Sequence, residues 1–317
     1  SVIETDFDTT VVLEKNVAEK LERWQDYKFG LFMHWGLYAV EGIVESWALC
    51  SEDVDWTKRD CDNYNEFKTW YENIRFRFNP VEFKPERWAD AAAKAGMKYV
   101  IFTTKHHDGF CMFDTKYTDY KVTSPDCPFS KNPRSNIAKE IFNSFRDKGF
   151  MIGAYFSKPD WHSEYYWWPY FGTGDRHVNY NPARHPERWQ GFKDFVYNQI
   201  EELVTDYGKM DILWLDGAWV RPIDNMNDKI QDWAKKSNYN QDIDMDRIAS
   251  MARKHQPGLI VVDRWVPGKY ENYATPENKV PPVPYPFPWE SCITITPGWG
   301  YSPNQPYKSV NELVHLL

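Results

Sequence analysis

Helix-like and strand-like patterns of apolar residues alternate along most of the chain. Between residues 192 and 207, apolar residues recur every three or four positions, which is the spacing of one helix face, and Gly208 closes the pattern. The run 210–216 follows and is almost continuously apolar, as in a strand of a parallel sheet covered by helices. The sequence predicts helices at residues 12–24, 85–95, 137–145, 192–207, 245–252 and 310–317, and strands at 28–34, 99–104, 150–157, 210–216, 259–262 and 290–295.

The connections differ in length on the two sides of the predicted strands. Turns from helix to strand hold a glycine and a few residues, whereas the segments after strands are long, at 37–84, 158–187, 217–243 and 264–289. This asymmetry is typical of a (β/α)8 TIM barrel, a fold of the α/β class. A doubly wound open sheet is the alternative, and the lack of a Gly-x-Gly-x-x-Gly motif after a first strand disfavours it. Because six strands are predicted, we expect a barrel that is cut short before its last strands.

Aromatic content is the compositional outlier, with 16 Trp, 20 Tyr and 19 Phe among 317 residues. Flat rings stack on the apolar faces of sugars, so this content fits carbohydrate contact as well as a large aromatic core. The rings at 161–171 lie in an expected loop. There they could form extra sugar subsites or pack against a neighbouring segment.

Charge and cysteine usage exclude several classes of partner. The formal net charge is -8 without a dense Lys/Arg run, which disfavours nucleic acid and anionic membrane surfaces. No stretch approaches the roughly 18 apolar residues of a membrane span. The 5 cysteines lack metal-site spacing, although Cys50 and Cys61 could pair. We therefore expect no metal and no cofactor.

Polar side chains follow five of the predicted strands. In chain order they are His34, the pair His106 and His107, Tyr155 with Ser157, Trp214 with Asp216, and Asp263 with Arg264. The carboxyl ends of barrel strands meet on one face, so these side chains are expected to converge. Taken singly, His34 could be a core histidine and Asp216 a loop cap. The adjacent histidines should point opposite ways on an extended segment, which disfavours a shared metal ion.

Together these residue types suit a neutral sugar ring. Imidazole and guanidinium groups bind hydroxyls, indoles cover an apolar ring face, and a carboxylate such as Asp216 attacks or stabilises the anomeric carbon. A retaining glycosidase needs a second carboxyl group about 5–5.5 Å away as acid/base. The loops offer four candidates for that role, namely Glu45, Glu271, Glu277 and Glu290.

Several of these segments resemble the motifs of glycoside hydrolase family 29, the α-L-fucosidases. The resemblance covers nearly the whole chain in order. It is carried by Phe29-Gly-Leu-Phe-Met-His-Trp-Gly36, Glu45-Ser-Trp47, Lys105-His-His-Asp-Gly-Phe110, Trp214-Leu-Asp-Gly217, Asp263-Arg-Trp265, Thr275-Pro-Glu277, Trp289-Glu290, Trp299-Gly-Tyr301 and Leu313-Val-His-Leu-Leu317.

The resemblance implies a catalytic barrel over residues 1–317, with a C-terminal β-sandwich that is usual in the family and absent from this chain. It implies a retaining double displacement with Asp216 as nucleophile and Glu277 as the favoured acid/base, with Glu290 and Glu271 as alternatives. The positions that would hold the sugar are His34, Glu45, Trp47, His106, His107, Tyr155, Trp214 and Arg264.

The expected activity is release of terminal α-L-fucose from glycans or oligosaccharides. An α-L-galactosidase acting on a polysaccharide is one alternative, because a methylene-scale difference supplies only about 1–3 kcal/mol of discrimination. A non-catalytic sugar-binding protein on the same barrel is another. No signal peptide is visible, so we expect a mature form that is periplasmic or extracellular, or lysosomal in a eukaryote.

Overall fold

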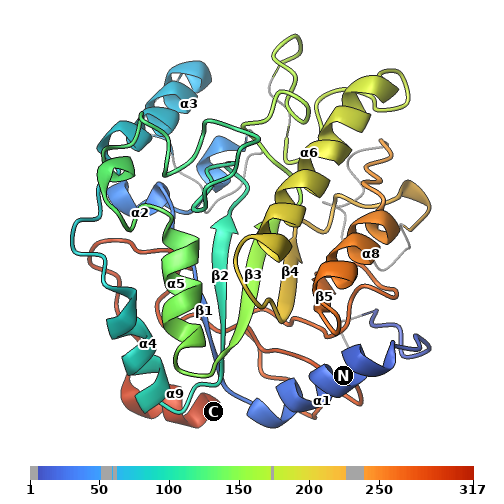
Figure 1. Ribbon diagram of the computed structural model, residues 1–317. Helices are drawn as coiled ribbons and strands as arrows, with labels where there is room; N and C mark the ends of the chain where they lie inside the picture. Colours follow the sequence, from blue (N-terminus) through green and yellow to red (C-terminus); the bar gives the residue numbers. More distant parts are fainter. Residues whose placement is uncertain (1–5, 51–58, 60–62, 173–174, 226–238) are drawn as a thin grey trace.

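A computed structural model describes residues 6–50, 59, 63–172, 175–225 and 239–317 (Figure 1). Within these residues, five strands form one parallel sheet in the order β1-β2-β3-β4-β5. They are β1 (Gly30–Met33), β2 (Tyr99–Lys105), β3 (Met151–Ser157), β4 (Ile212–Asp216) and β5 (Ile260–Asp263). The spatial order follows the sequence order without the reversal of a doubly wound sheet. The strands therefore occupy consecutive positions of a barrel wall, and the predicted fold class is confirmed.

Helices connect successive strands and cover one face of the sheet (Figure 1). They are α4 (Pro85–Lys94), α5 (Ile137–Arg146), α6 (Pro186–Thr205) and α8 (Met245–His255), while α1 (Lys15–Tyr27) precedes β1 and contacts β5. The predicted helices correspond to these elements, although α1 begins and ends three residues later than expected. The apolar faces predicted for α5 and α6 are buried.

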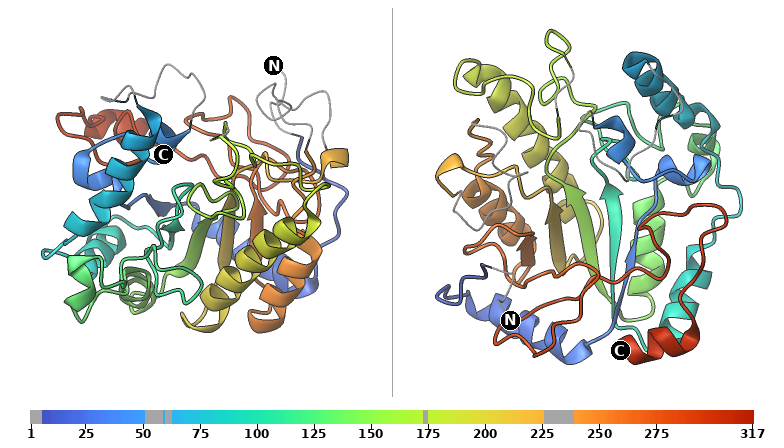
Figure 2. Two further views of the ribbon diagram at one scale, coloured as in Figure 1. Left: turned by 90° about the horizontal axis from the view of Figure 1, so that it is seen from above. Right: turned by 180° about the vertical axis from the view of Figure 1, so that it is seen from behind.

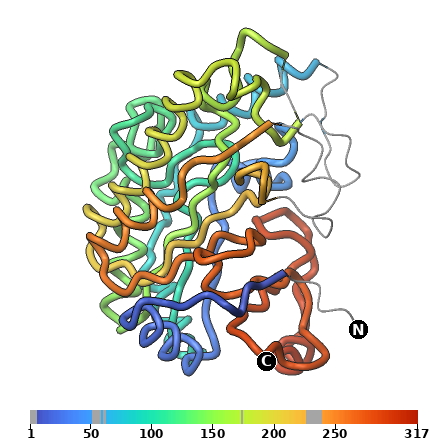
Figure 3. The backbone as a smooth tube through the Cα atoms, turned by 90° about the vertical axis from the view of Figure 1, so that its right-hand side faces the viewer, coloured from blue at the N-terminus to red at the C-terminus, as the bar shows by residue number. Residues whose placement is uncertain are grey.

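Successive residues of each strand enter two different cores, because side chains alternate across a sheet. Val100, Ile152, Leu213 and Val261 belong to the core beneath the helices. Ile101, Met151, Ile212 and Ile260 belong to a second core, which also contains Trp24 and Tyr273 with their rings stacked 4.0 Å apart. Figures 2 and 3 show the segment after β5 crossing the face of the sheet opposite α5, α6 and α8.

The long segments after strands contain further short elements. These are α2 (Tyr38–Glu41), η1 (Trp47–Leu49), α3 (Tyr64–Asn73), η2 (Ile74–Arg77), η3 (Pro128–Lys131), η4 (Ile223–Asn225) and α9 (Val310–Leu316). The helix α3 lies in a segment that the sequence suggested to be a loop. Its N-cap Asn63 accepts hydrogen bonds from the backbone of Asn65 and Glu66, and Phe67 and Tyr71 bury its apolar face.

The sixth strand predicted at 290–295 is wrong. The segment forms one isolated bridge, between Glu277 and Cys292. The Glu290 and Cys292 amides donate to the Ala274 and Pro276 carbonyls of the preceding loop, and the Ile295 carbonyl accepts from the Lys308 amide. The segment therefore lies against loops instead of joining the sheet.

None of the described helices combines the length and apolar character needed to cross a bilayer. The thiols of Cys111, Cys127 and Cys292 are free and buried. The suggested pairing of Cys50 with Cys61 cannot be followed, because Cys61 lies outside the described residues.

Candidate active site

A cavity of about 560 Å³ lies where the carboxyl ends of the five strands meet. Side chains from β1, β3 and β4 and from the segments after β1, β2, β3, β4 and β5 contribute to its wall. Its lining includes every predicted sugar-binding residue and two of the predicted catalytic carboxylates, namely His34, Glu45, Trp47, His106, His107, Tyr155, Trp214, Arg264, Asp216 and Glu277. The convergence expected from the strand ends is therefore confirmed for these residues, whereas Ser157 and Asp263 are buried and do not line the cavity.

Asp216 is the last residue of β4 and has polar contacts on both carboxylate oxygens. The Tyr155 hydroxyl donates to Oδ2 at 2.6 Å, and the Gly217 amide donates to Oδ1 at 3.0 Å. Nη1 of Arg264 lies 3.6 Å from Oδ1. Gly217 has φ +94°, and a Cβ there would collide with the ring of Pro159, so the turn behind the carboxylate requires glycine.

The charge state of Asp216 follows from these neighbours. Burial raises the pKa of its carboxyl group, but the Arg264 guanidinium and the hydrogen bond from Tyr155 outweigh burial and hold the pKa well below its usual range. The carboxylate is therefore ionised at neutral pH. Only 17% of its side chain is exposed, and that part faces the cavity.

Both adjacent histidines line the cavity, and their ring centres lie 4.3 Å apart. The expectation that they point opposite ways is wrong, because the chain leaves the extended path at the end of β2 and turns, with the Gly109 amide bonded to the His106 carbonyl. Nδ1 of His106 lies 2.6 Å from Ser46 Oγ, and Nδ1 of His107 lies 2.6 Å from Ser157 Oγ.

The three histidines of the cavity are neutral at physiological pH. Burial, followed by the neighbouring His106, lowers the pKa of His34 to about 3. Burial also lowers the pKa of His107 to about 4 and that of His106 well below its usual value. Neutral imidazoles offer one hydrogen-bond donor and one acceptor each, which suits uncharged hydroxyl groups.

Among the described residues, His106, His107 and Asp216 form a group whose nearest ligand atoms all lie within 4.8 Å of one another. The Nδ1 atoms of both rings are already engaged by serines. The sequence-based expectation of no metal remains a prediction.

Aromatic rings form much of the cavity wall. Trp214 stacks on Tyr155 with ring centres 5.5 Å apart, and its indole N–H donates to Glu290. The guanidinium of Arg176 lies over Trp47 and Trp219, at 4.9 and 5.3 Å from the ring centres. Arg176 was not predicted, because a single arginine in a long loop carries no periodicity or motif that would place it in the cavity.

Most of the aromatic segment 161–171 packs into the protein. Trp161 and Tyr166 are fully buried, and Trp161 stacks on Trp167 at 5.3 Å. Tyr170 is the most exposed ring of the segment at 78%. None of these rings is among the residues that line the cavity, so the contacts favour the packing interpretation over an extra sugar subsite.

The candidate acid/base residues have three different environments. Glu277 lines the cavity, with 34% of its side chain exposed, and its Oε2 lies 3.3 Å from Nη2 of Arg264. The same guanidinium thus contacts both Glu277 and Asp216. Glu271 and Glu290 are buried and do not line the cavity.

Glu290 and Glu271 satisfy internal donors instead. Glu290 accepts hydrogen bonds from the Tyr99 and Tyr273 hydroxyls at 2.8 and 3.1 Å and from Trp214 at 3.1 Å. Glu271 accepts from the Trp265 amide at 2.8 Å, and burial raises its pKa to about 8. Glu290 therefore supports the aromatic wall from behind.

Glu45 is a fourth carboxyl group and lies in the cavity. It is 5% exposed and accepts a hydrogen bond of 2.8 Å from the Gly300 amide. Burial raises its pKa to about 6 despite hydrogen bonds from the backbone of Gly300 and Trp299. This bond ties the segment after β1 to the segment that precedes α9.

Comparison with known proteins agrees with this geometry. A family model described as alpha-L-fucosidase matches residues 4–317. A plasma alpha-L-fucosidase from Homo sapiens is 28% identical, with 99% of this chain and 62% of that protein covered. A putative alpha-L-fucosidase from Caenorhabditis elegans is 26% identical, with 93% of this chain and 56% of that protein covered. The chain thus spans less than two thirds of the length of these relatives.

A solved structure has the same arrangement. The alpha-L-fucosidase isoenzyme 1 from Paenibacillus thiaminolyticus superposes with a TM-score of 0.71 at 31% identity, covering 95% of this chain and 67% of that one. The match of the family model over almost every residue, together with the carboxylate-bearing cavity at the strand ends, shows that the chain belongs to the alpha-L-fucosidase family.

Proposed function

We propose that this chain is a retaining exo-glycosidase that releases terminal α-L-fucose from glycans or oligosaccharides. The observation that carries the proposal is the placement of two carboxylates, Asp216 and Glu277, on one guanidinium at the wall of one cavity. Retaining hydrolysis requires one carboxylate that attacks and one carboxyl group that transfers protons. The membership of the chain in the alpha-L-fucosidase family supports fucose as the sugar that is released.

Asp216 is the nucleophile in this proposal. Its ionised oxygen attacks the anomeric carbon, forming a glycosyl ester while the bond to the leaving oxygen breaks. Glu277 donates a proton to that leaving oxygen and then removes a proton from the water that hydrolyses the ester. The hydrogen bonds from Tyr155 and Gly217 hold the carboxylate so that its reacting oxygen faces the cavity.

The remaining cavity residues would bind the sugar. The neutral imidazoles of His34, His106 and His107 offer hydrogen-bond donors and acceptors to the sugar hydroxyl groups. The Glu45 side chain accepts hydrogen bonds from the same hydroxyl groups. Trp47, Tyr155 and Trp214 present aromatic surface, and Arg264 balances the charge of the two carboxylates. Neutral hydrogen-bonding groups beside aromatic surface suit a small uncharged ring, and the Arg264 guanidinium is already engaged by the two carboxylates.

Turnover of 4-nitrophenyl α-L-fucoside and 4-nitrophenyl α-L-galactoside, measured side by side, tests the proposal. We expect hydrolysis of the fucoside to dominate, with the retained anomer as first product in NMR spectra. A dominant galactoside activity would change the substrate assignment, and binding without turnover of either compound would indicate a sugar-binding protein.

The nucleophile assignment has its own test. The variant Asp216→Gly should lose turnover, and added azide should restore part of it and yield the fucosyl azide of inverted configuration. Near wild-type turnover of Asp216→Gly would rule the assignment out.

We also propose that the protein acts outside the cytoplasm, in the periplasm or the extracellular space. The human relative is a plasma alpha-L-fucosidase, which supports this proposal. Cell fractionation with activity measured in each fraction tests it, and activity confined to the cytoplasm would contradict it.

A further inference from the structure

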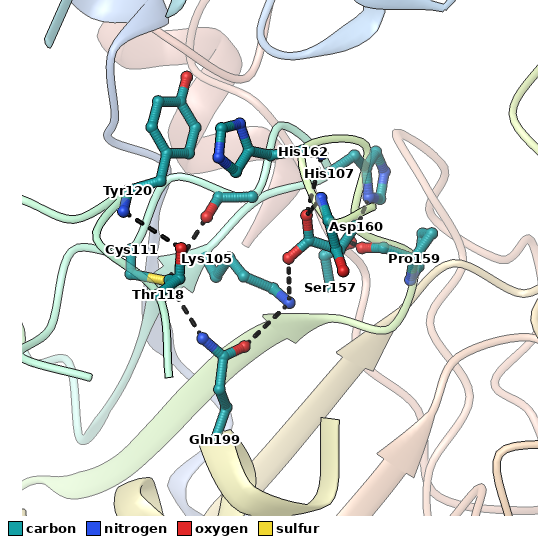
Figure 4. A network of polar contacts seen from close by, with 12 residues as sticks. Lys105, His107, Cys111, Thr118, Tyr120, Ser157, Pro159, Asp160, His162 and Gln199 are labelled. Carbon is teal, nitrogen blue, oxygen red and sulfur yellow. Dashed lines mark hydrogen bonds and ion pairs between the residues drawn. The ribbon is translucent and has the colours of Figure 1, made fainter. Parts of the chain in front are cut away.

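The adjacent histidines of the cavity, His106 and His107, each contact a serine hydroxyl, and one of these hydroxyls donates to its histidine while the other accepts. Beside His107, the Ser157 hydroxyl donates its proton to the Pro159 carbonyl at 2.7 Å (Figure 4). A hydroxyl has only one proton, so Ser157 Oγ can only accept from the His107 ring. Nδ1 of His107, 2.6 Å away, must therefore carry a hydrogen. The neutral ring is then unprotonated at Nε2.

Ser46, beside His106, acts as a donor to its histidine. Ser46 Oγ accepts a hydrogen bond of 2.9 Å from the backbone amide of Asp108. The Ser46 side chain is fully buried, and among the contacts of the described residues the acceptor within reach of its own proton is Nδ1 of His106, 2.6 Å away. Because Nδ1 accepts, the neutral ring of His106 carries its hydrogen on Nε2.

Nε2 of His107 makes no direct hydrogen bond to the nucleophile. Nε2 of His107 lies 3.7 Å from Oδ2 of Asp216, which is too long for a direct hydrogen bond. A hydroxyl oxygen placed between them could donate to either atom. The lone pair on Nε2 therefore faces a position that a sugar hydroxyl can occupy.

A buried ion pair holds the carbonyl that sets the His107 tautomer. Asp160, the next residue after Pro159, lies 3.0 Å from Nζ of Lys105, and both side chains are buried (Figure 4). The other carboxylate oxygen of Asp160 accepts from the amides of His162 and Ser163 at 3.0 and 2.8 Å. The turn that presents the Pro159 carbonyl to Ser157 is thus fixed from both sides.

We propose that Ser46 and Ser157 are positioning residues that lock the adjacent histidines into opposite tautomers. His106 then offers a donor at Nε2 and His107 an acceptor at Nε2. The pair therefore suits two hydroxyl groups of one sugar. One hydroxyl accepts a hydrogen bond from His106, and the other donates one to His107. That last step rests on the proposed function. The same tautomers leave His106 without a lone pair at Nε2, so the pair is unsuited to a shared metal ion.

Long-range ¹H–¹⁵N correlation spectra of the full chain, labelled with ¹⁵N at histidine, test the tautomers directly. Signals are assigned with the variants His106→Gln and His107→Gln. We expect the Nδ1–H form for His107 and the Nε2–H form for His106 in the wild-type protein without ligand. Two rings in the same tautomer would overturn the proposal.

The serine variants predict an asymmetric result. In Ser157→Ala, His107 loses the acceptor for its Nδ1–H and should shift toward the Nε2–H form. In Ser46→Ala, His106 should stay in the Nε2–H form, while the ¹⁵N signal of its Nδ1 moves because a donor is lost. An unchanged His107 spectrum in Ser157→Ala would contradict the role of Ser157, and an unchanged His106 spectrum in Ser46→Ala that of Ser46.

A matched control removes a hydroxyl elsewhere. Thr123→Val deletes the hydrogen bond from Thr123 to Asp114 at 2.6 Å, which lies outside the network of Lys105 and Asp160, and should leave both tautomers and KM unchanged. Ser157→Ala should lower kcat/KM on the aryl fucoside by about 2- to 10-fold, the size of effect expected from losing one hydrogen bond that orients a binding histidine. If the wild-type protein hydrolyses neither fucoside nor galactoside, the proposed function fails, and the spectra still decide the tautomers.

Discussion

Tyr155 and Asp216 lie at the ends of neighbouring strands, and the phenol donates a 2.6 Å hydrogen bond to the carboxylate. The phenol is fully buried, so this bond forms away from bulk solvent. It restrains one oxygen of Asp216 and lowers the pKa of the carboxyl group together with Arg264, against the effect of burial. The proposed nucleophile therefore depends on its neighbour for both orientation and charge.

The variant Tyr155→Phe should weaken catalysis while keeping the fold. A hydrogen bond to a charged group contributes about 1.5–3 kcal/mol, so we expect kcat/KM on the aryl fucoside to fall by about 10- to 150-fold. Tyr207→Phe is the control, because the Tyr207 hydroxyl contacts Asn136 away from the cavity. Equal losses in both variants would argue against a specific role for Tyr155.

Glu277→Ala should show the kinetics of a missing acid/base. Without a proton donor, turnover should fall much more for substrates with a poor leaving group than for 2,4-dinitrophenyl α-L-fucoside. Azide should accelerate the second step and give a fucosyl azide of retained configuration. Equal losses on both substrates, without azide rescue, would point to a binding role instead.

Glu290→Ala should affect stability first. The change leaves the Trp214 indole N–H and the Tyr99 and Tyr273 hydroxyls without their buried acceptor. Each unsatisfied buried group costs about 1–3 kcal/mol, so the free energy of unfolding should fall by at least that amount. Urea unfolding measures it. An unchanged stability together with azide-rescued turnover would instead support Glu290 as the acid/base.

Glu271 should make stability depend on pH. Burial raises its pKa to about 8 in the folded protein, whereas the ordinary pKa of a glutamate side chain is 4.5. A raised carboxyl pKa means that the folded state holds more protons between those values, so stability falls as pH rises from about 4.5 to about 8.

The variant Glu271→Gln keeps an acceptor for the Trp265 amide and cannot ionise. It should match the wild-type melting temperature near pH 4.5 and exceed it near pH 8, with activity retained. Parallel melting curves of the two proteins over this range would contradict the prediction.

The buried pair of Lys105 and Asp160 should be essential for stability. Lys105→Met leaves Asp160 buried without its cation, which costs about 3–5 kcal/mol. Lys148→Met is the control, because its ion pair with Asp90 is about half exposed and should contribute no more than about 1 kcal/mol. Chemical denaturation of both variants measures the contrast.

The sheet could be predicted because its signal is local. Near-continuous apolar runs mark the strands, and glycines end the helices before them. The bounds predicted for these strands and helix ends agree with the structure to within a few residues. The convergence of His34, Asp216 and Arg264 followed from the rule that parallel strand ends meet on one face. The sugar-binding and catalytic roles of these residues, and a C-terminal β-sandwich, stay predictions.

What the sequence could not supply depends on contacts between distant segments. The segment after β5 has no periodicity, so the choice among Glu271, Glu277 and Glu290 rests on which side chain reaches the cavity. The false strand at 290–295 has the same origin, since its partner is a loop. Arg176 enters the cavity through a long loop whose path only the folded chain defines.

The cavity takes its walls from the ends of all five strands, from His34 after the first to Arg264 after the last. Helices and turns can form from local sequence, but this site exists only when the first and last strands share one sheet. Turnover is therefore a stricter measure of correct assembly than helix content. A fragment that lacks either outer strand could look folded by circular dichroism and still have no site.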